Sequence, residues 1–155
     1  NVMLGYWRDP AATRRVLRSG WLWTGDLATT DAEGWIYLRG RKNQWVKIAG
    51  HRVHPSEIEQ FLRMRHPQLE LVVVPFDGPQ RGTRLALFVR SDSAGSLSEE
   101  ELIVECRGSL PGHKVPKYVE KVVDFPRTPA RKVALHVLAA RATAASLAIW
   151  NREQR

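Results

Sequence analysis

The sequence predicts a small α+β fold, with a central three-stranded sheet flanked by helices and one further β-hairpin. Two apolar, β-branched segments, 69–76 and 83–90, are separated by a glycine- and proline-containing loop, which is the pattern of paired strands. A third strand-like segment covers 117–125. Segments with helical spacing of apolar residues lie before and between these strands, so helices and strands are mixed along the chain.

Each of the other elements has its own local signal. Proline or serine stands where three helices are expected to begin, at Pro10, at Pro55 with Ser56, and at Ser98. The expected elements are a helix over 10–17, strands over 21–28 and 34–41 joined by a turn, a bent hairpin over 45–54, helices over 55–65 and 96–110, and a helical tail from 133 onward.

The chain is expected to divide at about residue 41. Five of its six tryptophans lie at or before Trp45, and so short a segment cannot bury that much aromatic surface by itself. We therefore expect 1–41 to be the edge of a larger body. We expect 42–140 to form a compact domain and 141–155 to form a helical tail.

Neither a membrane nor an exported location is indicated. The longest uncharged run near the end, 142–150, is far shorter than the ~20 apolar residues that a membrane helix needs, and no export signal is recognisable at the start. The single cysteine, Cys106, cannot form an internal disulfide, which fits a reducing cytoplasm. It shares a helix face with Leu102 and Leu110, so we expect a buried structural thiol.

The net charge of +8 is unevenly distributed. Within 113–132, six lysines and arginines stand against two acidic residues, and such a patch attracts anions. Nucleic acid, a phosphate-rich small molecule such as coenzyme A, and a solvated basic face all fit this charge. No helix-turn-helix, zinc-finger or RNP pattern supports the first, so we expect no nucleic-acid partner.

Asp26 and Arg41 stand near the open end of the hairpin predicted over 21–41. If the turn centres on residues 32–33, Asp26 lies opposite about residue 39, and Arg41 is a diagonal neighbour within reach of a long side chain. A carboxylate can accept bonds from two adjacent hydroxyls while a guanidinium donates in a planar fork. The two groups together suit the diol of a ribose, and a plain salt bridge is the alternative that the pattern leaves open.

Five motifs in order resemble the late motifs of the adenylate-forming superfamily, which includes acyl- and aryl-CoA synthetases, peptide-synthetase adenylation domains and luciferases. They are GYWRDPAAT (5–13), GWLWTGDL with DAEGWIYLRGR (20–27 and 31–41), VKIAGHRVHPSEIE (46–59), LPGHKVPKYV (110–119) and PRTPARK (126–132). Together they cover almost all of residues 3–135.

Members of this superfamily have a large N-terminal domain and a small mobile C-terminal domain. The resemblance implies that 1–41 is the last edge of the large domain and that 42–140 is the mobile lid. No phosphate loop rich in glycine, serine and threonine occurs in the chain. The resemblance therefore implies that the large N-terminal domain is a partner that is missing from this sequence, and we expect the chain alone to be inactive.

The resemblance also implies roles for residues around the boundary. Asp26 binds the ribose hydroxyls of ATP and of the acyl-adenylate, and Arg41 assists it. Asn43 stands at the family's hinge, where Asp or Lys is common; its amide forms hydrogen bonds but carries no charge.

A loop that follows the hinge is implied to serve the second half-reaction. Lys47 and Arg52 match positions near the adenylate, with an exposed strand face as the alternative. Ala49 and Gly50 match the loop beside the incoming thiol, where a missing Cβ lets a ligand approach the backbone closely.

Lys132 matches the lysine that enters the large domain for the first half-reaction. There a carboxylate attacks the α-phosphate of ATP, and an ammonium between the two anions stabilises the developing charge. The usual glycine before this lysine is Arg131, and the usual small polar residue before that is Ala130. Arg131 either crowds the nucleotide or adds a second cation.

Three functions are compatible with these motifs. The first is the C-terminal fragment of an ATP-dependent acyl- or aryl-CoA ligase that activates a carboxylic acid and transfers it to coenzyme A. The second is a fragment of an adenylation domain that loads a carrier protein, and the third is a stand-alone lid that acts as a binding or regulatory subunit. Mg²⁺ would accompany ATP, and no ligand set for a metal is expected in this chain; His51 and His54 point to opposite faces of a strand.

Overall fold

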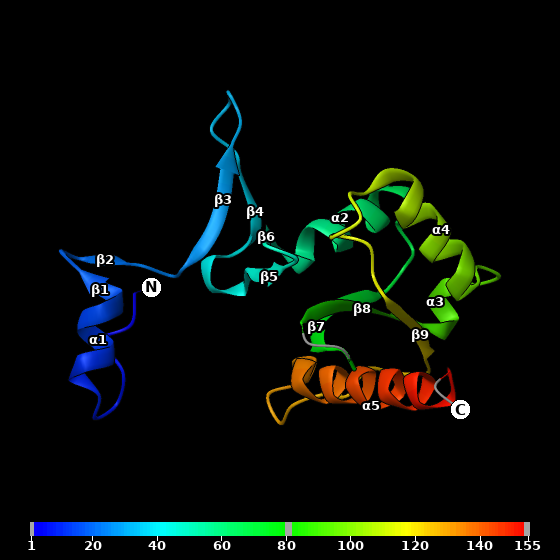
Figure 1. Ribbon diagram of the computed structural model, residues 1–155. Helices are drawn as coiled ribbons and strands as arrows, with labels where there is room; N and C mark the ends of the chain where they lie inside the picture. The colour runs from blue at the N-terminus through cyan, green and yellow to red at the C-terminus, as the bar shows by residue number, and fades with distance from the viewer. Residues whose placement is uncertain (1, 80–81, 154–155) are drawn as a thin grey trace. The chain divides into compact units, whose positions relative to one another are not determined.

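A computed structural model of the protein describes residues 2–79 and 82–153, which form two compact units divided between Gln44 and Trp45. The helices and strands of both units are labelled in Figure 1. Among these described residues, none of the helices combines the length and apolar character that crossing a bilayer requires.

The first unit consists of one helix and two short antiparallel strand pairs. The helix begins where it was predicted, because Pro10 occupies its first turn and Asp9 Oδ1 accepts a hydrogen bond from the N–H of Ala12 at 2.8 Å. The elements are α1 (Pro10–Val16), β1 (Leu17–Arg18), β2 (Trp21–Leu22), β3 (Asp26–Thr30), β4 (Ile36–Arg41) and the short 3-10 helix η1 (Lys42–Gln44).

The single strand predicted over 21–28 is wrong, because two strands occupy this segment. β2 pairs with β1, whereas β3 pairs with β4. Gly25 lies between them with a φ of 75°, in the left-handed region that an extended strand does not use. The glycine therefore ends one pair and redirects the chain into the next.

Large aromatic side chains of the first unit lie in solvent. Of the described side chains between residues 2 and 44, none is buried. The exposed tryptophans of this unit are Trp7 (87%), Trp21 (76%), Trp23 (62%) and Trp35 (67%). This confirms that the segment cannot bury its aromatic surface by itself.

The second unit is the predicted α+β fold around a three-stranded sheet of order β7-β8-β9. β7 and β8 are antiparallel neighbours, while β9 joins β8 in parallel after the α3–α4 crossover. The elements are β5 (Val46–Ile48), β6 (His51–Val53), α2 (Pro55–Arg65), β7 (Leu71–Asp77), β8 (Thr83–Arg90), α3 (Ser91–Ala94), α4 (Glu99–Ser109), β9 (Tyr118–Val122) and α5 (Leu135–Glu153).

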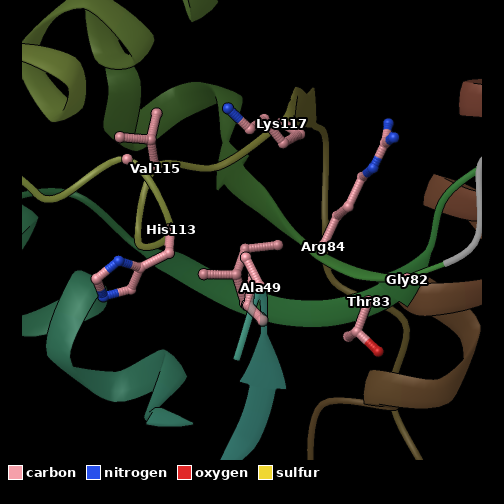
Figure 2. A pocket seen from close by; sticks show the side chains of 10 residues that line it. Ala49, Gly82, Thr83, Arg84, His113, Val115 and Lys117 are labelled. Carbon is pink, nitrogen blue, oxygen red and sulfur yellow. The ribbon is translucent and has the colours of Figure 1, made fainter. Parts of the chain in front are cut away.

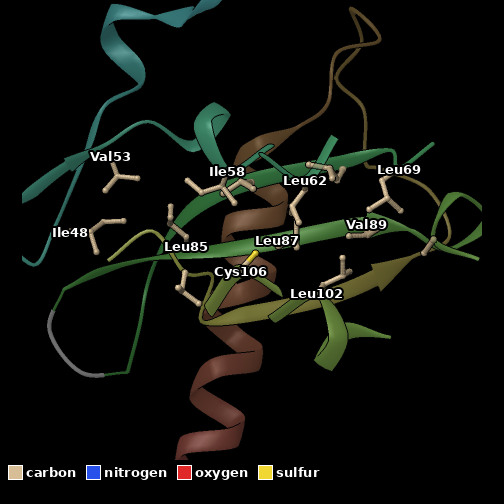
Figure 3. Packing of buried hydrophobic residues seen from close by; sticks show 14 residues of the cluster. Ile48, Val53, Ile58, Leu62, Leu69, Leu85, Leu87, Val89, Leu102 and Cys106 are labelled. Carbon is tan, nitrogen blue, oxygen red and sulfur yellow. The ribbon is translucent and has the colours of Figure 1, made fainter. Parts of the chain in front are cut away.

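Both faces of this sheet are buried, so alternate residues of one strand belong to different clusters. Along β8, Leu85 and Leu87 pack with α2, α4 and the β5–β6 hairpin, as Figure 3 shows. Ala86 and Phe88 pack on the other face with α5. The two clusters together fix the positions of the hairpin and of the loops around the sheet.

Helix α4 shows how local signals and packing agree. Ser98 Oγ accepts from the N–H of Glu101 at 3.1 Å, and Glu101 Oε2 accepts from the N–H of Ser98 at 2.7 Å, which is a capping box. The bond from the Ser98 N–H lowers the pKa of Glu101. Leu102 and Cys106 face the core with no measurable exposure, so the structural thiol predicted from helical spacing is confirmed.

Burial raises the pKa of Cys106 to about 11, which yields a prediction about its reactivity. At pH 8 only about one thiol in a thousand would be ionised, and the thiolate is the reactive form. Ellman's reagent should therefore leave the native chain unlabelled over an hour and modify one thiol per chain in guanidinium chloride. Labelling of the native chain at the rate of an exposed cysteine would contradict this.

Candidate functional site

Asp26 and Arg41 form an ion pair at the open end of the β3–β4 hairpin. Arg41 Nε lies 3.0 Å from Asp26 Oδ1, and the two side chains are 64% and 30% exposed respectively. A surface pair of this kind contributes at most about 1 kcal/mol to stability. The arrangement therefore does little for the fold, but it places a carboxylate and a guanidinium side by side on the surface.

The two residues face each other directly, which corrects the predicted register by two positions. One position comes from the turn, because Asp31 Oδ1 accepts from the N–H groups of Glu33 and Trp35 and centres the turn on Glu33. The other comes from a register shift between Leu27 and Ala28. Such a β-bulge adds one residue to one strand and turns the following side chains.

The β5–β6 hairpin places two cations opposite each other. Lys47 pairs in register with Arg52, and both side chains are exposed. Like charges directly opposite on neighbouring strands destabilise a hairpin. A bound anion between them would remove this repulsion; that such an anion binds here stays a prediction.

The tip of this hairpin is a two-residue turn formed by Ala49 and Gly50. Their φ angles are 47° and 86°, which is the left-handed pair that a tight hairpin turn requires. A Cβ added to Gly50 would meet no described atom within 4 Å. Within this chain, glycine at position 50 is therefore explained by its backbone conformation; the close approach of a ligand remains a prediction.

A cleft of about 450 Å³ lies beside this tip in the second unit. Figure 2 shows Ala49 between the loop that carries His113 and the start of β8. Three basic residues and several apolar ones form its wall. The lining residues are Ile48, Ala49, Gly82, Thr83, Arg84, Leu85, Gly112, His113, Val115 and Lys117.

Two of the motifs meet at the edge of this cleft. The ring of His51 stacks on that of His113, with 4.1 Å between centroids and 7° between planes. Next to them, Lys114 Nζ lies 2.5 Å from Glu57 Oε2 of α2. Burial lowers the pKa of His113, and the charges of His51 and Lys114 lower it further against the opposing effect of Glu57.

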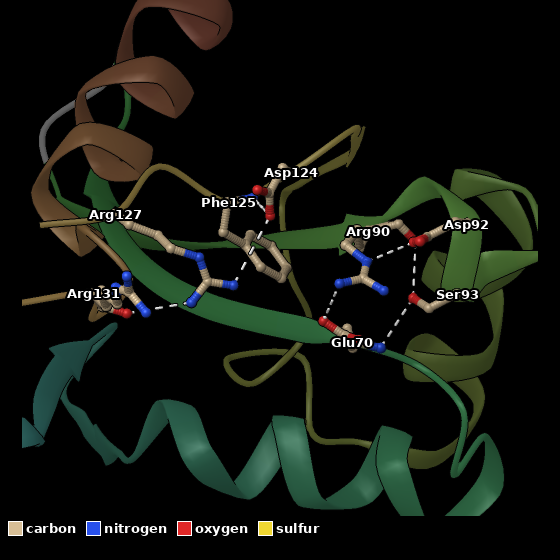
Figure 4. Close-up of polar contacts among 8 residues, drawn as sticks. All are labelled: Glu70, Arg90, Asp92, Ser93, Asp124, Phe125, Arg127 and Arg131. Carbon is tan, nitrogen blue, oxygen red and sulfur yellow. Dashed lines mark hydrogen bonds and ion pairs between the residues drawn. The ribbon is translucent and has the colours of Figure 1, made fainter.

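Lys132 lies at the end of a tight turn that leads into α5. Its carbonyl accepts from the N–H of Thr128 at 2.7 Å, and Arg127 and Val133 form a β-bridge around the turn. Arg131 has a φ of 58°, in the left-handed region that glycine adopts more readily than other residues. Its carbonyl accepts from Arg127 Nη1 at 3.3 Å, as Figure 4 shows.

The expected site residues thus lie on four separate segments, which are the β3–β4 hairpin, η1, the β5–β6 hairpin and the turn before α5. Asp26 and Arg41 belong to the first unit, the hairpin cations and Lys132 to the second. The backbone of Asn43, the expected hinge, lies in η1, but its side chain falls outside the described part of the chain.

Sequence reasoning did not anticipate the cleft or the histidine stack. Each histidine follows a glycine in a recognisable motif, at Gly50–His51 and Gly112–His113, but nothing local indicates that they meet. His54, by contrast, is buried and caps α2, where its Nδ1 lies 2.7 Å from Ser56 Oγ. Within residues 2–79 and 82–153, no group of three or more His, Cys, Asp or Glu side chains could hold a metal ion.

Comparison with known sequences gives one family and a consistent set of relatives. Residues 57–132 match the AMP-binding enzyme C-terminal domain family. The chain is 40% identical over 132 residues to a long-chain-fatty-acid–CoA ligase of Yersinia pestis, with 85% of this chain and 23% of that protein covered. A Bacillus subtilis long-chain-fatty-acid–CoA ligase is 36% identical, with 85% and 24% covered. The chain therefore spans about a quarter of the length of these relatives.

Solved structures with the same fold are adenylate-forming enzymes. ATP-bound MatB from Rhodopseudomonas palustris superimposes with a TM-score of 0.75 at 29% identity, covering 94% of this chain and 29% of that one. Amide bond synthetase McbA from Marinactinospora thermotolerans gives 0.74 at 32%, covering 90% and 28%. The fold is that of the C-terminal portion of these enzymes. The chain belongs to the adenylate-forming superfamily.

The left-handed conformation of Arg131 yields a prediction about stability. A residue with a Cβ is destabilised by about 1 kcal/mol in this conformation, and glycine removes that cost. The greater freedom of glycine in the unfolded chain cancels part of this gain. Arg131→Gly should therefore raise the free energy of unfolding by roughly 0.5–1 kcal/mol, measured by urea denaturation with circular dichroism. Arg131→Ala keeps the Cβ and is the matched control. An equal gain in both variants would show that charge, not backbone strain, is responsible.

Proposed function

We propose that this chain is the C-terminal portion of an ATP-dependent acyl- or aryl-CoA ligase that makes an acyl-adenylate and transfers the acyl group to coenzyme A. The observation that carries the proposal is the contact of 3.0 Å between Asp26 and Arg41 at the mouth of a hairpin. In this proposal Asp26 accepts hydrogen bonds from the two ribose hydroxyls, and Arg41 holds the carboxylate in place while donating to the nucleotide.

Residues 1–41 would form the edge of the large domain, 42–140 the mobile lid, and 141–155 a helical tail. The large domain would supply the phosphate loop and the acid-binding pocket. ATP would bring Mg²⁺ with it, and the described residues of this chain offer no ligand set for that ion. The free, buried Cys106 fits a reducing cytoplasm.

Lys132 would serve the first half-reaction. A carboxylate oxygen of the substrate attacks the α-phosphorus of ATP, forming the acyl phosphate bond as the bond to pyrophosphate breaks. Both reacting groups are negative, so an ammonium between them stabilises the charge that develops. The exposed position of Lys132 at the end of a tight turn would allow it to enter a neighbouring domain.

The β5–β6 hairpin would serve the second half-reaction after the lid rotates about Asn43. The thiol sulfur attacks the acyl carbon, a tetrahedral intermediate forms, and AMP leaves. Lys47 and Arg52 would stabilise the departing phosphate, since they lie opposite each other on exposed strands. Ala49 and Gly50 would lie beside the thiol.

The proposal names coenzyme A as the acceptor of the acyl group. The basic residues Lys114, Lys117 and Lys121 suit the phosphates of coenzyme A, and Lys117 lines the cleft beside the hairpin tip. The same charges also suit an acidic carrier protein. Thioester formation with free coenzyme A favours the ligase, whereas transfer to a carrier alone favours the adenylation domain.

A chimera tests the proposal directly. This chain would replace the matching C-terminal portion of a long-chain-fatty-acid–CoA ligase, and ATP–pyrophosphate exchange and thioester formation would be measured separately. We expect exchange by the chimera and none by the 155-residue chain alone, which has no phosphate loop. Exchange by the chain alone, or a folded chimera that forms no acyl-adenylate, would refute the proposal.

Lys132→Ala separates the two half-reactions. In the chimera it should lower ATP–pyrophosphate exchange by about 10²–10³-fold, because one preorganised charge is lost. Thioester formation from preformed acyl-adenylate should change by less than about threefold. Lys132→Arg keeps a cation at the same place and should recover part of the exchange. Equal loss of both half-reactions in the alanine variant would contradict this role.

A further inference from the structure

The tip of the β5–β6 hairpin is short and carries little packing of its own. Ile48 on one strand and Val53 on the other are buried in the core, while Ala49, Gly50 and Arg52 between them are exposed. The tip therefore needs an additional contact if its backbone is to be held in one position. The stack of His51 on a residue from a distant loop supplies such a contact.

The geometry of this stack is close to parallel. The ring centroids of His51 and His113 are 4.1 Å apart and the ring planes differ by 7°. His51 directly follows Gly50, so the stack acts on the residue next to the left-handed turn. The loop that bears His113 is itself anchored, because Val115 is buried and Lys114 pairs with Glu57 of α2.

Positive charge predominates around the two rings. Lys114 adjoins His113 in the loop before β9, and Arg84 and Lys117 line the cleft together with His113. Lys47 and Arg52 alternate with His51 along the hairpin and therefore lie on its other face. From α2 comes one carboxylate, Glu57, which pairs with Lys114, and the neighbouring His54 is turned to Ser56. A proton added to His113 therefore enters surroundings that repel it, because burial disfavours the charged ring and His51 and Lys114 lower its pKa further, and two protonated rings would repel each other.

We propose that His113 is a positioning residue, which acts through His51 to fix the Ala49–Gly50 tip for thiol transfer, and that this device fails in acid. The role in thiol transfer rests on the proposed function, whereas the stack itself does not.

The direction of the pH effect follows because the folded structure favours the neutral form of His113. The pKa of His113 is lowered by burial and then by His51 and Lys114, so the folded structure disfavours the proton. The contribution of the stack is fully present above the ordinary histidine pKa of about 6.5. It is lost as the pH falls through the lowered value, because protonation then opposes the stack.

Two variants separate stacking from titration. His113→Phe keeps a flat ring that cannot be protonated, and His113→Ala removes the ring. In the chimera, we expect His113→Ala to lower kcat for thioester formation from preformed acyl-adenylate by about three- to tenfold at pH 8. ATP–pyrophosphate exchange should stay within about twofold. His113→Phe should keep the rate at pH 8 and lose less of it at pH 5 than the parent chimera.

Exposed His136 on α5 provides the matched control. His136→Phe should leave the acid side of the pH profile unchanged. A thioester rate that is the same in His113→Ala as in the parent at both pH values would overturn the proposal. So would an identical acid loss in the parent and in His113→Phe.

A second measurement keeps the outcome independent of the ligase assignment. NMR spectra of the ¹⁵N-labelled 155-residue chain would follow the amide of Gly50 between pH 5 and 8. This amide should move with a histidine titration in the parent, broaden or shift in His113→Ala, and stay near its parent position in His113→Phe. A chimera without acyl-adenylate formation would sink the proposed function alone. If the Gly50 amide signal and its pH dependence were the same in the parent and in both variants, the positioning role would be overturned.

Discussion

Burial of both faces of the β7-β8-β9 sheet decides where charge can lie in the second unit. The five consecutive residues 85–89 of β8 have relative exposures of 1% or less. A lysine or arginine within this run would lose its hydration without gaining a partner, which is costly. The cations that we propose to act are therefore confined to the β5–β6 hairpin, the loop before β9 and the turn before α5.

Two of these segments, the β5–β6 hairpin and the turn before α5, share a further property, which is a left-handed backbone. Ala49, Gly50 and Arg131 all have positive φ, and two of the three carry a side chain that pays for this conformation. Tight turns of this kind bring neighbouring side chains to fixed places with few residues. The cost is borne by a unit with two well-packed clusters, which can hold strained turns that a smaller core would not.

Much of the fold could be predicted because its signals are local. The continuous apolar run within 83–90 is typical of a strand buried on both faces, and Ser98 with Glu101 marks the start of α4. The break at Gly25 was missed because apolar residues continue on both sides of it. The register of the β3–β4 hairpin was missed because it depends on the side chain of Asp31 and on a bulge, neither of which alters the strand pattern.

The candidate site was predictable only within each motif. A hairpin over 45–54 already brings Lys47 and Arg52 together, since a two-residue turn leaves no other register. His51 and His113 are a different case, because their contact depends on how the loop before β9 packs against the hairpin. No periodicity or turn signal contains that information. The ion pair of Glu57 with Lys114 arises from the same packing and was hidden for the same reason.

The parallel pairing of β9 with β8 has a consequence for how this fold assembles. β7 and β8 are joined by a short loop, so they can pair early, whereas β9 must wait until the α3–α4 crossover closes a much longer loop. We expect nascent chains to complete the antiparallel ribbon first and the segment with His113 and Lys132 last. A chain that ended before residue 113 would thus contain the β7–β8 hairpin but would lack β9, His113 and Lys132.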